Sequence, residues 1–251
     1  FEDVAMYRAL PGATIVDVAD SAQMENIFPK LVKRPGVKYI RVNRKANDQV
    51  YAEGNDFEIG KGAVIREGAD VTIIAAGYMV GKAMKAAELL AEKGIQASVI
   101  DMFTIKPLDD ALVTEYARKT GAIVTAENHN KFGGLYSAVA ECLAENCPVP
   151  MGRVAVEDEF GEVGPVDYLA ERFGLTPEHI VAEAEKVADH YGIPTLDLTD
   201  AKDAAERSAR LTAFAAALFK DAVVPAKPVP RKLPPPLHPG AELRPQIVSY
   251  E

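Results

Sequence analysis

The chain has 251 residues, of which 48% are hydrophobic and 26% charged, as is typical of a globular protein rather than a disordered or fibrous one. Its formal net charge of -9 disfavours binding to nucleic acid or to an anionic lipid surface, because like charges repel. No apolar stretch approaches the ~20 residues of a membrane-spanning helix, and no signal-peptide pattern is recognised. We therefore expect a cytoplasmic protein with neither a nucleic-acid nor a membrane partner.

Residues 1–58 predict part of an α/β domain. The pattern is a helix, a strand, a second helix and a second strand, over residues 2–8, 13–18, 20–31 and 38–42. Asp20 followed by Gln23 resembles a capping box that begins the second helix. Two strands and two helices cannot enclose a core of their own, so we expect an incomplete domain. The helical pattern that starts at Phe1 suggests a truncated or processed chain.

Residues 59–190 predict a complete α/β domain, which follows a polar segment over residues 45–62 that marks the boundary. The strands are expected over residues 71–75, 96–101, 122–126 and 153–156, and the helices over residues 79–92, 109–120, 135–145 and 176–189. Strict alternation with short connections predicts a doubly wound parallel sheet, covered by helices on both faces. Residues 191–251 predict a helix over residues 199–219 and then a proline-rich tail.

Gly77 and Gly81 flank a turn between a strand and a helix, which is where dinucleotide-binding proteins hold phosphate. The Gly-x-x-x-Gly spacing lacks the further glycine of that fingerprint. We therefore interpret this segment as a tight packing turn. The two cysteines, Cys142 and Cys147, have no histidine or second cysteine pair near them and are expected to be reduced thiols rather than zinc ligands.

Residues 127–130, with the sequence Glu-Asn-His-Asn, end a strand, and Gly133 and Gly134 open the next helix. A carboxylate beside a histidine is suited to acid–base chemistry, and free N–H groups at a helix start are suited to an anion. The alternative is a domain or subunit contact, where the glycines permit close approach of two backbones. We favour the contact.

Arg41, Arg44 and Lys45 end the strand that begins at Lys38. Parallel strands carry functional side chains at their C-terminal ends, and a guanidinium group matches a phosphate monoester. Arg41 and Arg44 are three residues apart, so in a continuing strand only one of them enters a given site. A solvated surface arginine is the alternative.

Taken in order, these segments resemble the transketolase family. Residues 2–20 are similar to the later half of its pyrimidine-binding domain. The landmarks of its C-terminal domain are matched by residues 72–77, 105–109, 127–135 and 160–161. The resemblance covers residues 1–188. It is shared with pyruvate-dehydrogenase-type E1 β subunits and deoxyxylulose-phosphate synthases, and the Ile-Lys-Pro-Leu-Asp run over residues 105–109 together with His129 favours transketolase.

The resemblance implies ketol transfer between sugar phosphates, with thiamine diphosphate and Mg²⁺ as cofactors of the complete enzyme. The family's cofactor-activating glutamate would lie upstream of Phe1, and the Gly-Asp-Gly motif that holds the metal and the diphosphate does not occur in this sequence. We therefore expect no catalytic, cofactor-binding or metal-binding residue here and no cofactor binding by the isolated chain. Arg44 matches the arginine that binds the phosphate of a sugar phosphate in many transketolases.

Three interpretations remain open. The first is a catalytic transketolase that needs an N-terminal segment or subunit and forms a homodimer or heterotetramer. The second is an E1 β component of a 2-oxo acid dehydrogenase, which a lipoyl-domain partner and a 2-oxo acid substrate would distinguish. The third is a non-catalytic assembly module that keeps the fold without the chemistry.

Overall fold

The computed structural model describes residues 1–43 and 47–190, the side chains of residues 189 and 190 excepted. Arg44, Lys45, the helix expected over residues 199–219 and the proline-rich tail lie outside the described residues. In the described part of the chain, none of the helices combines the length and the apolar character that a bilayer crossing requires.

A small sheet joins the start of the chain to a strand from beyond residue 100. Its strands, within the described residues, are β1 (Thr14–Asp17), β2 (Lys38–Arg41) and β6 (Thr104–Lys106), with α1 (Asp3–Arg8) before β1 and α2 (Ser21–Lys33) after it. The order is β2-β1-β6, in which β2 runs parallel to β1 and β6 antiparallel to it. The order of elements expected for residues 1–42 is confirmed. The sequence does not predict β6, because three residues are too few to show a period.

The side-chain cap expected at the start of α2 is present, but the reciprocal bond of Gln23 reaches Ala19, one residue before the N-cap Asp20. Asp20 Oδ1 accepts the backbone N–H of Gln23 at 2.9 Å, and Gln23 Oε1 accepts the backbone N–H of Ala19 at 2.8 Å. Two N–H groups at the helix start thereby gain partners, which typically contributes about 1 kcal/mol for an N-cap side chain. Asp20 and Gln23 also help to hold the loop that follows β2, Asp20 directly and Gln23 through Asp101.

A large sheet forms the second half of the described chain. Its strands are β3 (Ala63–Arg66), β4 (Val71–Ala75), β5 (Ala97–Asp101), β7 (Ile123–Asn130) and β8 (Met151–Val156), in the order β3-β5-β4-β7-β8. All neighbours are parallel except β3, which pairs antiparallel with β5 at the edge. The α/β class with parallel-sheet character is confirmed, and β3 is the addition that the sequence pattern does not predict.

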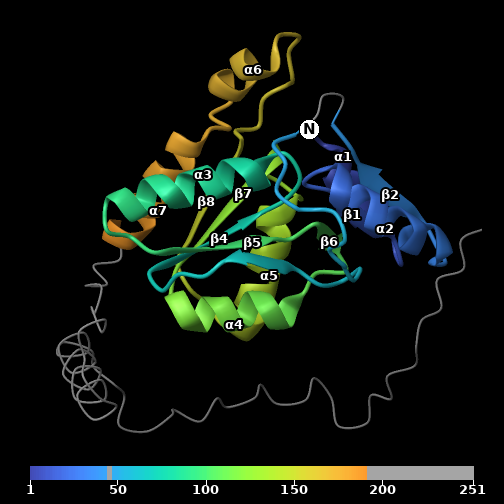
Figure 1. Ribbon diagram of the computed structural model, residues 1–251, viewed down its shortest axis with the longest axis horizontal. Helices are drawn as coiled ribbons and strands as arrows, with labels where there is room; N and C mark the ends of the chain where they lie inside the picture. Colours follow the sequence, from blue (N-terminus) through green and yellow to red (C-terminus); the bar gives the residue numbers. More distant parts are fainter. Residues whose placement is uncertain (44–46, 191–251) are drawn as a thin grey trace, which may run out of the picture. The chain divides into compact units, whose positions relative to one another are not determined.

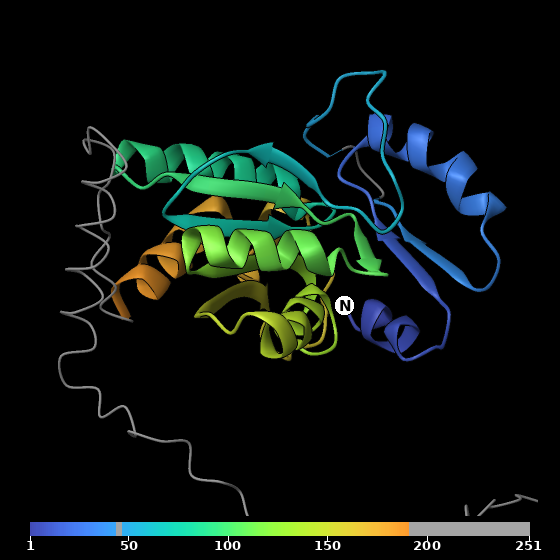
Figure 2. The same cartoon turned by 90° about the horizontal axis from the view of Figure 1, so that it is seen from below.

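Helices cover both faces of the large sheet, as Figures 1 and 2 show. The helices are α3 (Met79–Glu92) and α7 (Pro177–His190) on one face, and α4 (Asp110–Thr120) and α5 (Leu135–Asn146) on the other, while α6 (Val166–Arg172) lies between β8 and α7 in the chain. Every residue of β4 is buried. Ile73 joins the apolar cluster beneath α3 and α7 and Ile74 joins the cluster beneath α4 and α5, because successive strand residues point to opposite faces.

Candidate functional site

Each nitrogen of the Arg41 guanidinium group, at the end of β2, meets a protein acceptor. Its Nε lies 2.7 Å from Asp3 Oδ2, its Nη1 donates to Asp17 Oδ2 at 2.8 Å, and its Nη2 donates to the carbonyl oxygen of Asn128 at 2.8 Å. The side chain is 16% exposed. Arg41 therefore joins α1, β1 and β7 through three of its five N–H groups.

Two carboxyl groups, those of Asp3 and Asp17, face the single positive charge of Arg41. Burial raises the pKa of Asp17, although the Arg41 guanidinium acts in the opposite direction. Burial disfavours the charged form of Arg41, but the Asp17 and Asp3 carboxylates outweigh that effect and raise the pKa of Arg41. Arg41 is consequently charged at every physiological pH and is held between two carboxylates. Such a pair costs several kcal/mol if only one partner is removed, because a charge is then left buried alone.

Glu127 caps a helix in the structure and does not face solvent. Its carboxylate accepts the backbone N–H groups of Leu135 at 2.6 Å and Tyr136 at 2.8 Å, at the start of α5. Its side chain is 2% exposed. Burial raises the pKa of Glu127 to about 7, and the two N–H groups act against that rise. The carboxylate therefore satisfies helix N–H groups that would otherwise be unpaired.

His129 is also buried, and it binds α1. Its Nε2 accepts the backbone N–H of Ala5 at 3.3 Å, so its Nδ1 carries the proton and donates to the carbonyl oxygen of Asn130 at 2.7 Å. Burial lowers the pKa of His129, which keeps the ring neutral. Its Nδ1 lies 3.8 Å from Glu127 Oε2, beyond hydrogen-bond distance. The geometry agrees with a contact and not with an acid–base pair.

Further contacts join α1 to residues between Lys106 and Glu141. Arg8 Nη1 donates to the carbonyl oxygen of Gly133 at 2.9 Å, and Arg8 Nη2 pairs with Glu141 Oε2 at 2.7 Å. Lys106 Nζ donates to the carbonyl oxygens of Arg8 and Leu10, each at 2.7 Å, where α1 ends. A Cβ on Gly133, whose φ is +77°, would lie 2.5 Å from Ala5 Cβ. The motifs at residues 105–109 and 127–135 thus form a docking surface for α1.

Asp101, at the end of β5, holds the loop that follows β2. Its Oδ2 accepts Gln23 Nε2 at 2.7 Å and the Tyr51 hydroxyl at 2.8 Å, while its buried Oδ1 has no partner among the described protein atoms. Burial raises the pKa of Asp101 to about 7. Asp20 Oδ2 holds the same loop by accepting the backbone N–H groups of Val50 and Tyr51, each at 2.8 Å. Two carboxyl groups therefore tether one loop.

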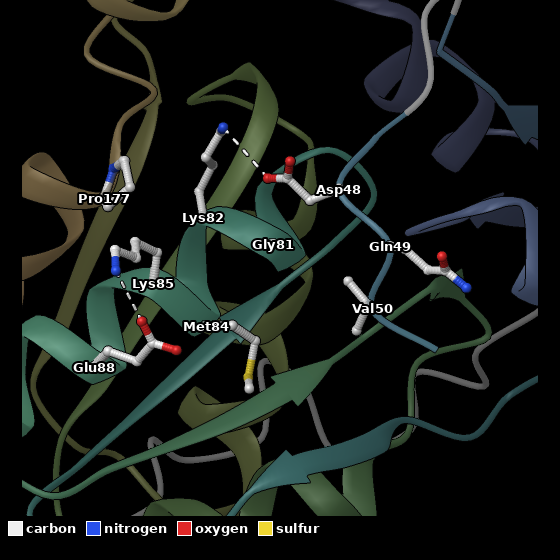
Figure 3. A pocket seen from close by; sticks show the side chains of 9 residues that line it. All are labelled: Asp48, Gln49, Val50, Gly81, Lys82, Met84, Lys85, Glu88 and Pro177. Carbon is white, nitrogen blue, oxygen red and sulfur yellow. Dashed lines mark hydrogen bonds and ion pairs between the residues drawn. The ribbon is translucent and has the colours of Figure 1, made fainter. Parts of the chain in front are cut away.

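Both glycines of the turn between β4 and α3 permit close packing, as we expected. A Cβ on Gly77, whose φ is +55°, would lie 2.0 Å from Asp17 Oδ1. A Cβ on Gly81 would lie 2.9 Å from Asp48. A pocket of about 350 Å³ lies beside Gly81. Figure 3 shows the side chains that line it, among them Lys82, whose Nζ lies 3.5 Å from Asp48 Oδ2. Lysines here face protein carboxylates, which leaves no unbalanced charge for an anion.

A more apolar cavity of about 430 Å³ lies beside the end of β2. Asn43 and Asn47, which flank residues 44–46 in the sequence, both line it, as do Asn128 of β7 and Tyr78 of the β4–α3 turn. The apolar wall includes Val166, Leu169 and Phe173. Sequence reasoning did not find this cavity, because its walls come from distant segments and α6 lacks a pattern long enough to predict. Arg44 itself lies outside the described residues.

The described residues do not fit a diphosphate and Mg²⁺. Among residues 1–43 and 47–190, no group of three or more His, Cys, Asp or Glu side chains could hold a metal ion. The buried carboxylates Asp17 and Glu127 are already bonded to Arg41 and to helix N–H groups.

These contacts and the fold define an α/β protein in which the large, mostly parallel sheet and its helices bind α1 and β2 through buried polar side chains. Residues 60–180 match the family described as the transketolase C-terminal domain. This chain therefore carries a transketolase C-terminal domain. The recognition made from residues 2–20 and from the landmarks between residues 72 and 161 is confirmed.

Two curated relatives cover most of the described chain. The 6-deoxy-6-sulfo-D-fructose transketolase subunit of Clostridium sp. (strain MSTE9) is 50% identical over 188 residues, which are 75% of this chain and 58% of the relative. A subunit of the apulose-4-phosphate transketolase of Phocaeicola vulgatus is 42% identical over 184 residues, 72% of this chain and 58% of the relative. The chain thus spans somewhat more than half the length of these relatives.

A comparison with solved structures leads to the same family. A split-gene transketolase, described as an inactive beta4 tetramer, has 45% identity and a TM-score of 0.71, and the match covers 74% of this chain and 61% of that one. Transketolase from Leishmania mexicana, with 20% identity and a TM-score of 0.61, supports the fold alone.

Proposed function

We propose that this chain is the C-terminal part of a transketolase that transfers a two-carbon ketol unit between sugar phosphates. The observation that carries the proposal is the 50% identity over 188 residues to a named transketolase subunit. The bonded state of Arg41, Glu127 and His129 agrees with it, because within the described residues these side chains join elements of the fold to one another. Thiamine diphosphate and Mg²⁺ would then be held by segments outside this chain.

Arg44 is the proposed contact for the phosphate group of the sugar. It matches the family's phosphate-binding arginine, and Arg41, the other arginine at the end of this strand, is already occupied by protein partners. The cavity lined by Asn43 and Asn47, which flank residues 44–46 in the sequence, supports the proposal, since amide N–H groups can donate hydrogen bonds to a sugar phosphate.

The proposed partner is the N-terminal portion of a transketolase, either as a segment or as a subunit. Within the described residues β2 pairs only with β1, so its other edge presents unpaired N–H and C=O groups. Phe28 and Val32, four residues apart on one face of α2, are 48% and 58% exposed. A neighbouring strand and its apolar cover would bury both features. A second copy of the assembly would complete a homodimer or heterotetramer.

Reconstitution tests the proposal. The chain would be co-expressed with a transketolase N-terminal segment that carries the Gly-Asp-Gly motif, and the purified complex would be assayed for ketol transfer and, by calorimetry, for thiamine diphosphate binding with Mg²⁺. We expect both in the complex and neither with this chain alone. Saturable micromolar binding of the cofactor by the isolated chain, or a cofactor-loaded complex without ketol transfer, would contradict the proposal.

A further inference from the structure

The loop between β8 and α6, together with the start of α6, exposes apolar side chains to water. We call residues 157–171 the acidic loop. Within it Phe160 is 92% exposed and Val163 is fully exposed, while Val166 and Tyr168 are 38% and 50% exposed. Single exposed apolar side chains are common in soluble proteins, but several within one short segment form a patch of the kind that marks an interaction site.

The acidic loop also carries a surplus of negative charge. It contains six acidic residues and no lysine or arginine. Lys131 and Arg153 both pair with Glu157. Arg172, which follows the loop, pairs with Glu159 and Glu162. Within the described residues, three carboxylates of the loop have no ion-pair partner, those of Asp158, Asp167 and Glu171. A partner of this surface must therefore offer cations as well as apolar contacts.

The turn between α2 and β2 has the opposite charge. We call residues 33–38 the basic turn, and its charged residues are Lys33, Arg34 and Lys38. In the part of the chain that the structure describes, none of these three cations is paired with a carboxylate. Val37, which precedes Lys38, is 45% exposed. Its carbonyl oxygen accepts the backbone N–H of Thr14 at 2.8 Å, so the turn is held against β1.

The basic turn complements the acidic loop. Three cations without partners on one surface correspond to three such carboxylates on the other. The alkyl stems of the lysines and the arginine, together with Val37, can cover Phe160 and Val163. Two copies of a chain with a net charge of -9 repel each other at long range, so their association needs a local match of opposite charges. The acidic loop and the basic turn provide that match.

We propose that the acidic loop of one copy of this chain binds the basic turn of a second copy. The two surfaces differ, so the contact is head-to-tail, and it repeats from copy to copy unless a ring closes. The contact uses neither the proposed N-terminal portion nor Phe28 and Val32 of α2, and it therefore goes beyond the proposed function.

Sedimentation velocity of the isolated full chain over a concentration series tests the proposal. We expect the wild type to self-associate. Val163→Lys in the acidic loop and Val37→Glu in the basic turn should each raise the Kd of self-association about tenfold or more. A mixture of the two variants should associate as tightly as the wild type, because the intact turn of the first variant meets the intact loop of the second.

Val64→Glu is the matched control. Val64 is 38% exposed on β3, at the opposite edge of the large sheet from β8, and its substitution should leave the Kd unchanged. If Val37→Glu does not fold, Lys38→Glu, which changes an exposed side chain at the start of β2, takes its place. A wild type that sediments as a monomer at every concentration overturns the proposal, as do loop and turn variants that self-associate like the wild type. If the mixture does not restore association, or if Val64→Glu weakens it equally, the contact is not between these two surfaces and the proposal is wrong.

Discussion

The backbone N–H of Leu135 donates to Glu127 Oε2 at 2.6 Å across the turn that joins β7 to α5. This bond brings the carboxylate against the backbone just before the helix, where Gly134 stands. A Cβ on Gly134 would lie 2.0 Å from the same oxygen. Its φ of -88° lies outside the left-handed region. The position of the Glu127 carboxylate is therefore a steric reason for glycine at this position.

Gly134→Ala should lower the free energy of unfolding by roughly 2–4 kcal/mol, because the carboxylate must move away from two helix N–H groups while it stays buried. Gly94→Ala is the control. Gly94 has a φ of +83° and open space around its Cβ position, so only backbone strain is added, about 1 kcal/mol. Urea unfolding of the two variants measures the difference. Equal losses would mean that Glu127 moves without cost.

The sequence predicts those helices and strands that depend on local hydrophobic periodicity and on helix capping. The helices of the described chain other than α6, the strand β4 and the cap at Asp20 follow from local patterns. The antiparallel strands β3 and β6 do not, because each is short and its pairing depends on residues far along the chain. The bonding partners of Arg41 and His129 also escaped prediction, since a sequence shows that an arginine ends a strand but not which acceptors surround it. The role of Arg44 in binding the phosphate group of the sugar stays a prediction.

Stability should fall as pH rises from about 4 to about 7. Burial raises the pKa of Asp101 to about 7 from an ordinary value of 3.8, with Asp17 and Asp20 adding to the rise and the Gln23 and Tyr51 donors opposing it. Between these values the folded chain keeps a proton that the unfolded chain has released. The contribution of Asp101 to the free energy of unfolding is fully present below pH 4, decreases as the pH rises, and is lost once the pH passes 7.

Asp101→Asn removes that titration while it keeps a similar shape. Between pH 5 and 8, the free energy of unfolding of the wild type should fall about 1–3 kcal/mol further than that of the variant. The pKa of Glu127 is also raised to about 7, so Glu127 contributes to the pH dependence of the free energy of unfolding that the Asp101→Asn variant keeps. Urea midpoints at a series of pH values provide the measurement. Parallel curves for the two proteins would show that Asp101 is ionised throughout.

Phe28→Lys should weaken binding of the N-terminal transketolase segment by tenfold or more, because a charge would enter the apolar contact proposed for α2 and the edge of β2. The melting temperature of this chain should hardly change, since Phe28 is 48% exposed. Lys186→Ala, at an exposed position on α7, is the control and should leave binding unchanged. Sedimentation velocity of mixtures decides the matter, and undiminished association of Phe28→Lys would place the contact elsewhere.

Arg44→Ala should act mainly on KM for phosphorylated sugars. A contact with a phosphate group remote from the transferred carbons is the same in the ground state and in the transition state, so its loss weakens binding and leaves kcat nearly unchanged. We expect kcat/KM for phosphorylated acceptors to fall by roughly tenfold to a few hundredfold, or ~1.5–3 kcal/mol for a charge-assisted pair. Arg44→Lys should recover part of the loss, because the ammonium keeps the charge but not the planar fork. Steady-state kinetics with matched acceptors is the measurement: equal losses on phosphorylated and unphosphorylated sugars would make Arg44 structural, and no loss on either would make it a solvated arginine.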